Sequence, residues 1–309
     1  MMASGVRVAA AVGVLAALLL APFAIYPVFL MKALCFALFA SAFNLLIGYV
    51  GLLSFGHAAF FGFSAYVAGH AAKVWGWPPE AALLAATLVA AVMGVVFGAL
   101  AIRRQGIYFA MVTLALAQMI FFLSLQAGFT GGEDGIQAIP RGVLLGVFDL
   151  GKPLVMYYFV LAVFLLGFLI IWRTINSPFG SVLKAIRENE PRAVSLGYRV
   201  DRYKLLAFVL SATLSGLAGG MKALVFQLAS LTDVHWHASG EVVLMTLLGG
   251  LGTVLGPAVG AVLIVGIQNY LAALGAWVTI VQGVVFVVVV LLFRRGIVGE
   301  LLARRRKGV

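Results

Sequence analysis

The sequence predicts an all-α, polytopic membrane protein, and three observations support this fold class. Hydrophobic residues make up 64% of the chain and charged residues only 10%, against about 45–50% and about 25% in soluble globular domains. Four runs, at 33–72, 105–132, 153–172 and 242–293, contain no Asp, Glu, Lys or Arg. Each run is long enough for at least one membrane-crossing helix, which takes about 20 apolar residues. The runs also lack the two-residue alternation of membrane β-barrels.

Ten spans account for the apolar segments. In chain order they cover about 7–26, 28–47, 52–72, 81–102, 106–127, 154–173, 204–226, 241–252, 256–274 and 277–293. The first resembles a secretory signal, but its apolar part of about 20 residues exceeds the ~7–15 of a signal core, so we interpret it as an uncleaved helix. The segment GGLGTVLGPAVG interrupts 241–274. It is either a tight turn between two spans or a broken helix at membrane depth.

Lysine and arginine predict that both termini are cytoplasmic, because cytoplasmic loops carry an excess of these residues. With ten spans, every basic cluster falls on one side of the membrane. These clusters are Arg7, Arg103–Arg104, 173–204 and 294–307. Lys222 is expected near the opposite interface, where a lysine can extend its ammonium to water. We therefore expect one transmembrane domain over 1–309, with a cytoplasmic loop at 174–203 and a basic tail at 294–309.

The residue patterns predict no enzyme site and no metal site. The four histidines, at positions 57, 70, 235 and 237, do not form a ligand arrangement such as H-E-x-x-H. The net charge of +11 is attributed to cytoplasmic loops rather than to nucleic-acid binding. No Asp, Glu or Arg is expected near the middle of a span, where ion-coupled carriers place carboxylates. This favours an energy source outside the spans.

Polar groups within the spans have two interpretations. In NLLIGYVGLLSFGHAAFFGFSAYVAG, the glycines form packing faces and the polar groups bind neighbouring backbone. Alternatively, Gly48 and Gly51 break a helix and present a polar turn to a transport pathway. The candidates for such a pathway are Asn44, Ser54, His57 and Gln118.

A second small-residue segment contains Gly252, Gly256 and Gly260 at G-x-x-x-G spacing. Such a face lets helices approach closely, either between two copies or inside one chain. The two glycine-interrupted segments occupy roughly matching places in the two halves of the chain. This is a weak indication of an internal repeat, as many transporters have.

The charged segment near the middle of the chain predicts two short amphipathic helices on the cytoplasmic face. Ser177–Pro178 provides a helix cap and a first-turn proline, and Glu190–Pro191 provides a second start. Gly197 is a stop signal, and Asp201 can cap the next span. Val182, Leu183 and Ile186 form an apolar stripe that needs a packing partner, although a basic loop could also serve only to fix topology.

Several motifs resemble LivM-type permeases, the membrane subunits of ABC importers for branched-chain amino acids and related compounds. They are SPFGSVLKAIRENEPRAVSLGYRVDRYKLLAFVLSATLSGLAGGM, GLLSFGHAAFFGFSAYVAG, IYFAMVTLALAQ, FTGGEDGI and EVVLMTLLGGLGTVLGPAVGA, which cover roughly residues 30–275. The resemblance implies a second, similar permease subunit, two cytoplasmic ATPases and an external substrate-binding protein. ATP and Mg²⁺ would bind to the ATPases, and this chain would carry no cofactor. Because the chain ends soon after the last span, its ATPase is expected to be a separate polypeptide.

The resemblance also implies that 178–197 couples the permease to an ATPase. On this basis Arg187, Glu188, Glu190 and Arg192 form the polar rim, with Val182, Leu183 and Ile186 on the packed side and Gly197 at the end. The ABC-importer pattern of Glu-Ala-Ala before a glycine is replaced here by Glu190-Pro-Arg-Ala193 before Gly197. Apolar amino acids are the expected cargo. The alternative cargoes are urea, amides and aromatic acids. The alternative class of transporter is a stand-alone secondary carrier.

Overall fold

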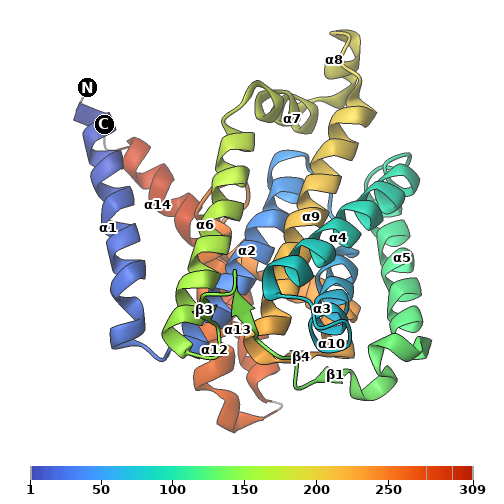
Figure 1. Cartoon of the computed structure of the whole chain (residues 1–309). Helices are drawn as coiled ribbons and strands as arrows, with labels where there is room; N and C mark the ends of the chain where they lie inside the picture. The colour runs from blue at the N-terminus through green and yellow to red at the C-terminus, as the bar shows by residue number, and fades with distance from the viewer. Residues whose placement is uncertain (1, 276, 294, 308–309) are drawn as a thin grey trace.

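The computed structural model describes residues 2–275, 277–293 and 295–307. Within these ranges the chain is mostly helical (Figure 1). The first half contains α1 (Met2–Ala24), α2 (Pro27–Tyr49), α3 (His57–Lys73), α4 (Pro79–Ala101), α5 (Ile107–Gln126), η1 (Gly128–Thr130) and η2 (Gly132–Asp134). The second half contains α6 (Pro153–Ile175), α7 (Pro178–Glu188), α8 (Glu190–Ser195), α9 (Val200–Phe226), α10 (Leu231–Val234), α11 (Trp236–Gly249), α12 (Gly256–Tyr270), η3 (Ala272–Leu274), α13 (Trp277–Leu292) and α14 (Gly296–Lys307).

Each of the ten predicted spans coincides with a helix, but the helices differ in length. Among the described residues, six are long and apolar enough to cross a membrane. They are Pro27–Tyr49, Pro79–Ala101, Ile107–Gln126, Pro153–Ile175, Val200–Phe226 and Trp277–Leu301. α11 and α12 have 14 and 15 residues, which at 1.5 Å per residue is shorter than a hydrocarbon core of about 30 Å. The structure therefore supports a polytopic helical membrane protein, and the count of ten crossings stays a prediction.

Proline places several of the helix starts. Pro27, Pro79, Pro153 and Pro178 each stand in the first turn of a helix. Proline suits this position because its missing N–H would have no intrahelical partner and its φ is already helical. The starts follow from local sequence alone.

α9 forms the centre of the bundle and packs against α2, α3 and α4. Glycine permits the close approach, since a Cβ at Gly219 would overlap the carbonyl group of Phe61 on α3. A Cβ at Gly216 would likewise meet Ala90 on α4 and Ser64 on α3. Small residues at helix contacts are typical of membrane bundles, where packing rather than the hydrophobic effect drives association.

The few strands are short and lie at the end of the bundle opposite α7 and α8 (Figure 1). β1 (Ile136–Gln137) pairs antiparallel with β4 (Leu228–Ala229), and β2 (Val143–Leu144) forms a hairpin with β3 (Phe148–Asp149). The start of α1 and the end of α14 lie toward the α7–α8 end instead.

Candidate functional site

α7 and α8 form the two short helices that the charged segment predicts. The Ser177 hydroxyl accepts a hydrogen bond from the Gly180 N–H at 3.3 Å, and the Asn189 side chain accepts one from the Arg192 N–H at 3.0 Å. The second helix therefore begins as predicted, but Asn189 is its cap. Gly197, with φ of +87°, follows the end of α8. The expected cap at Asp201 is wrong, because this residue lies within the first turn of α9 after Arg199.

The apolar stripe of α7 packs on the chain's own bundle. Leu183 is fully buried in a cluster with Leu46 of α2 and Phe208 of α9. Ile186 is also buried, in a cluster with residues of α8 and α9, and Val182 packs at its edge. Leu183 and Ile186 are therefore covered by the chain itself, whereas Val182 is half-buried.

Two of the predicted rim charges make internal contacts. The Arg187 guanidinium donates a hydrogen bond to the carbonyl oxygen of Gly48, near the end of α2. Glu190 accepts from the Lys204 ammonium at 2.5 Å and from the Gln105 amide at 3.0 Å. Because Lys204 is almost fully buried, Glu190 fastens α8 to α9 and to the loop before α5.

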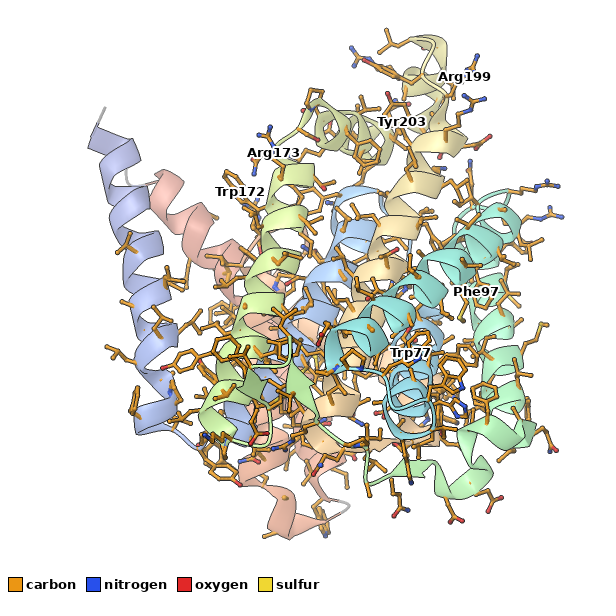
Figure 2. All side chains as sticks on the ribbon, in the orientation of Figure 1. Trp77, Phe97, Trp172, Arg173, Arg199 and Tyr203 are labelled. Carbon is orange, nitrogen blue, oxygen red and sulfur yellow. The ribbon has the colours of Figure 1, made fainter. Side chains whose placement is uncertain are left out.

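The exposed tip of this region is partly apolar. Glu188 and Arg192 are exposed, and so are Val194, Leu196 and Tyr198, with Leu196 at 67% exposure. Figure 2 shows Arg199 at the same tip, with Trp172 and Arg173 at the adjacent end of α6. Sequence reasoning missed the three apolar residues of the tip. The sequence feature that could have identified them is the apolar residue at every second position, 194, 196 and 198, within a charged segment.

Asn44 lies where the two glycine-interrupted segments meet. Its amide nitrogen donates to the carbonyl oxygen of Thr253 at 2.9 Å, and its amide oxygen accepts from the N–H of Gly252 at 3.0 Å. A Cβ at Gly48 would overlap both Asn44 and Gly252. α2 continues through Gly48 and ends before Gly51, whose φ is +84°. The glycines thus have different roles, since the first permits packing and the second follows the end of the helix.

The remaining pathway candidates are packed among helices. The His57 ring is fully buried, and its Nε2 lies 2.8 Å from the Ser211 hydroxyl. Ser211 donates its own proton to the carbonyl of Ala42 at 2.6 Å, so its oxygen is free to accept a hydrogen bond from the His57 Nε2–H. Ser54 is fully buried and accepts from the Gly56 N–H. Gln118 is half-buried on α5. A pathway role for these residues stays a prediction.

The segment between α11 and α12 is non-helical over 250–255, with positive φ at Gly250 and Gly252. A Cβ at Gly260 would overlap the carbonyl oxygen of Met245, and one at Gly256 would overlap the Thr253 hydroxyl. In the structure this small-residue face therefore packs inside one chain, with α12 against α11.

A cavity of about 570 Å³ is lined by residues from the start of α2, the end of α9 and α10, and these segments lie at the end of the bundle opposite α7 and α8. We call it the charged cavity, because its lining includes two lysines and two carboxylates together with aromatic rings. These residues are Lys32, Lys222, Asp233, Glu241, Phe36, Phe61 and Phe226. Of the two carboxylates, Asp233 is buried on α10 and Glu241 is half-buried on α11.

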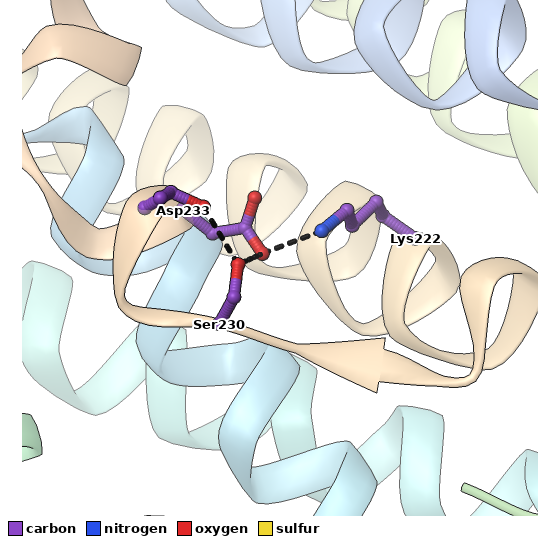
Figure 3. A network of polar contacts seen from close by, with 4 residues as sticks. Lys222, Ser230 and Asp233 are labelled. Carbon is purple, nitrogen blue, oxygen red and sulfur yellow. Dashed lines mark hydrogen bonds and ion pairs between the residues drawn. The ribbon is translucent and has the colours of Figure 1, made fainter. Parts of the chain in front are cut away.

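Lys222 does not extend freely to water as expected. Its ammonium forms an ion pair with the Asp233 carboxylate at 2.5 Å, and Ser230 also donates to that carboxylate at 3.1 Å (Figure 3). His235 borders the same cavity, and burial, with the nearby His237, lowers its pKa below the usual 6.5. The lowered pKa favours the neutral form of His235 at pH 7, and Lys32 and Lys222 are the two lysines of the lining.

A second cavity, of about 680 Å³, lies at the α7–α8 end. Its basic lining includes Lys184, Arg187 and Arg295, and Gly252 and Thr253 also border it. The loop that Asn44 holds therefore borders this second cavity, while α2 and α11 also reach the charged cavity.

Apolar helices of membrane-spanning length, cavities of about 570 and 680 Å³ and a charged helical pair at one end are the arrangement expected of a multi-pass α-helical permease. The comparison with protein families agrees. The chain belongs to the family described as "Branched-chain amino acid transport system / permease component", which matches residues 28–290. No solved structure matches the chain.

Three relatives illustrate the range of this similarity. The chain is 30% identical to the high-affinity branched-chain amino acid permease protein LivM of Salmonella typhimurium and 29% identical to that of Escherichia coli, in each case over 72% of this chain and 58% of the relative. It is 32% identical to the ribose import permease protein RbsC of Bacillus subtilis over 58% of each chain. The matched region thus spans little more than half the length of these relatives.

Proposed function

We propose that this chain is a permease subunit of an ATP-driven ABC importer in the bacterial cytoplasmic (inner) membrane. The observation that carries the proposal is the family match over residues 28–290. The proposed cargo is a branched-chain or related hydrophobic amino acid, supported by the similarity to two LivM proteins over 72% of this chain. Other relatives are named as importers of ribose and autoinducer 2, so the cargo needs its own test.

The proposed topology has ten spans with both termini in the cytoplasm. The distribution of Lys and Arg supports it, and so does the placement of the α1 start and the α14 end toward α7 and α8 (Figure 1). On this topology the charged cavity opens to the outside and the second cavity opens to the cytoplasm.

The proposed coupling surface is the exposed tip of α8 with the turn that follows it. Arg192, Val194 and Leu196 offer one charge and two exposed apolar side chains, a combination suited to a partner groove. Glu188 is a further exposed charge. The buried contacts of α7 and the ion pair of Glu190 make this surface rigid with the bundle.

Movement of the tip would reach the membrane through α7. Arg187 of α7 binds the Gly48 carbonyl, and Gly48 packs against the Gly252 that Asn44 holds. ATPase closure could therefore shift the loop between α11 and α12 and alternate the opening of the two cavities. The partners would be a second permease subunit, two ATPases that bind ATP and Mg²⁺, and an external substrate-binding protein. The remaining alternatives are urea, amides or aromatic acids as cargo, or a stand-alone carrier.

Reconstitution in proteoliposomes tests this proposal. The chain alone is compared with the chain assembled with its ATPases, second permease and binding protein, and uptake of labelled leucine is measured with and without ATP. We expect uptake only from the full assembly with ATP. Uptake by the chain alone, without ATP, would instead support a secondary carrier. Uptake of urea or ribose but not leucine would overturn the proposed cargo.

A further inference from the structure

The charged cavity combines features that a small polar solute with an apolar part requires. Its volume of about 570 Å³ lies within the ~300–1,000 Å³ usual for small-molecule sites. Phe36, Phe61 and Phe226 supply apolar walls, and the charged groups come from α2, α9, α10 and α11. No single element contains the set, so the fold itself brings it together.

One of the two acid–base pairs is already satisfied. Lys222 and Asp233 are joined at 2.5 Å, each with 12% of its side chain exposed. Ser230 completes the carboxylate's contacts (Figure 3). A paired, hydrogen-bonded couple of this kind has little residual attraction for a charged solute. Its role is to join α9 to α10.

The other pair is not satisfied. Among the residues that the structure describes, Lys32 makes no hydrogen bond or ion pair, although it is half-buried. Glu241 accepts one hydrogen bond, from the neutral Gln268 amide at 3.2 Å. Lys32 and Glu241 both line the charged cavity, and they form no direct ion pair with each other. A half-buried charge without a partner is costly unless something compensates it.

We propose that Lys32 and Glu241 form the two poles of a solute site in the permease that selects zwitterions. The Lys32 ammonium would bind the solute carboxylate, the Glu241 carboxylate would bind the solute ammonium, and the phenylalanine rings would contact its apolar side chain. This inference rests on the proposed importer function and names residues for its cargo.

The arrangement predicts a specific order of preference. A solute with only a positive charge meets the repulsion of Lys32, and one with only a negative charge meets that of Glu241. A neutral sugar leaves both charges uncompensated. A zwitterion alone compensates both, so the permease would repeat a selection that a binding protein makes first.

Charge-edited ligands test the site without the binding protein. The full chain is placed in nanodiscs, and calorimetry measures the affinity for leucine, leucinamide (a cation) and 4-methylpentanoate (an anion). For the natural chain we expect leucine to bind at least about tenfold more tightly than either analogue, the scale of one lost charge-assisted hydrogen bond. Lys32→Gln should remove the preference for leucine over leucinamide. Glu241→Gln should remove the preference over 4-methylpentanoate.

Matched controls make the same chemical changes outside the cavity. Lys152→Gln and Glu133→Gln alter exposed residues and should leave both preferences unchanged. If Lys32 or Glu241 has only a structural role, its substitution would weaken the binding of all three ligands equally and leave the ratios of their affinities unchanged. That result would overturn the proposal. Absence of leucine binding to the natural chain would also overturn it. Leucine uptake is also compared between full assemblies that contain the natural chain or Lys32→Gln. Equal uptake by the two would refute the site, while the importer function would stand.

Discussion

Asn44 joins two segments that lie more than 200 residues apart in the sequence. Both polar atoms of its amide bind the backbone of the loop between α11 and α12, at Thr253 and Gly252. The side chain is 2% exposed, so water cannot replace these bonds. Asn44 thereby connects the end of α2 to the non-helical segment beside the second cavity.

Asn44→Leu should destabilise the protein because it removes both hydrogen bonds and leaves the carbonyl of Thr253 and the N–H of Gly252, both half-buried residues, without their partner. We expect a loss of roughly 2–4 kcal/mol, about 1–2 for each bond, measured as thermal unfolding in detergent. Asn44→Asp keeps the acceptor for Gly252 but replaces the donor to Thr253. Asn44→Asp should also unfold at a lower temperature than the natural chain. If an Asn44 variant loses transport activity but unfolds at the natural temperature, a pathway role for Asn44 is favoured instead.

His57→Phe separates packing from hydrogen bonding in the core. The His57 ring contacts Phe43, Phe60 and Phe208 edge-on, and phenylalanine can keep these contacts. The lost bond to Ser211 should cost about 1 kcal/mol, whereas His57→Ala also creates a cavity and should cost about 3–5 kcal/mol, by analogy with other large side chains. Thermal unfolding checks the order. Equal stability of both variants, with altered transport, would contradict the packing role.

The pair of Glu190 and Lys204 should behave as a structural ion pair. Lys204→Met removes a buried cation and leaves Glu190 with its Gln105 contact, while Glu190→Gln leaves the Lys204 ammonium, whose side chain is 3% exposed, without a counter-charge. Breaking a buried pair costs about 3–5 kcal/mol, yet replacing both partners is often nearly neutral. We therefore expect the double variant to be more stable than Glu190→Gln alone. Additive losses in unfolding temperature would argue against coupling.

The α8 tip should carry much of the affinity for an ATPase. Val194→Ser with Leu196→Ser removes two exposed apolar contacts, and we expect about a tenfold or greater loss of affinity, as for interface hot spots. Co-purification and surface-based binding measure it. Val147→Ser, at the opposite end and 75% exposed, is the control. Undiminished binding of the double variant would show that the ATPase docks elsewhere.

Arg192→Ala should add to that loss, while Glu190→Ala should act through stability. Arg192 is exposed, whereas Glu190 has 27% of its side chain exposed and is held by Lys204. A normal unfolding temperature together with weak ATPase binding is therefore expected for Arg192→Ala alone. If Glu190→Ala instead unfolds normally and binds the ATPase weakly, while Arg192→Ala binds it normally, Glu190 is the residue that contacts the ATPase.

Local signals in the sequence were sufficient for the spans and for the starts of α7 and α8, although Asn189 is the cap of α8 and the expected cap at Asp201 is wrong. Proline and serine at helix starts, and uncharged runs of helical length, predict every span and the pair α7–α8 because these features act over a few residues. The partner of a polar side chain, in contrast, depends on elements that are distant in the sequence. Lys32 is one charge at the edge of an uncharged run, and nothing nearby in the sequence shows that α11 places Glu241 across a cavity from it. The partners of Asn44, Arg187 and Glu190 were hidden for the same reason.

Gly260→Ala tests whether the small-residue face serves packing within one chain. A Cβ at Gly260 would overlap the Met245 carbonyl of α11, whereas one at Gly266, on the same helix, would meet nothing within 4 Å. Gly260→Ala must push α12 away from α11 and should cost about 1–3 kcal/mol. Gly266→Ala should be neutral or slightly stabilising, because alanine favours the helix. Thermal unfolding should therefore separate the two variants. If Gly260→Ala instead unfolds normally but loses association with another permease subunit, the face serves assembly.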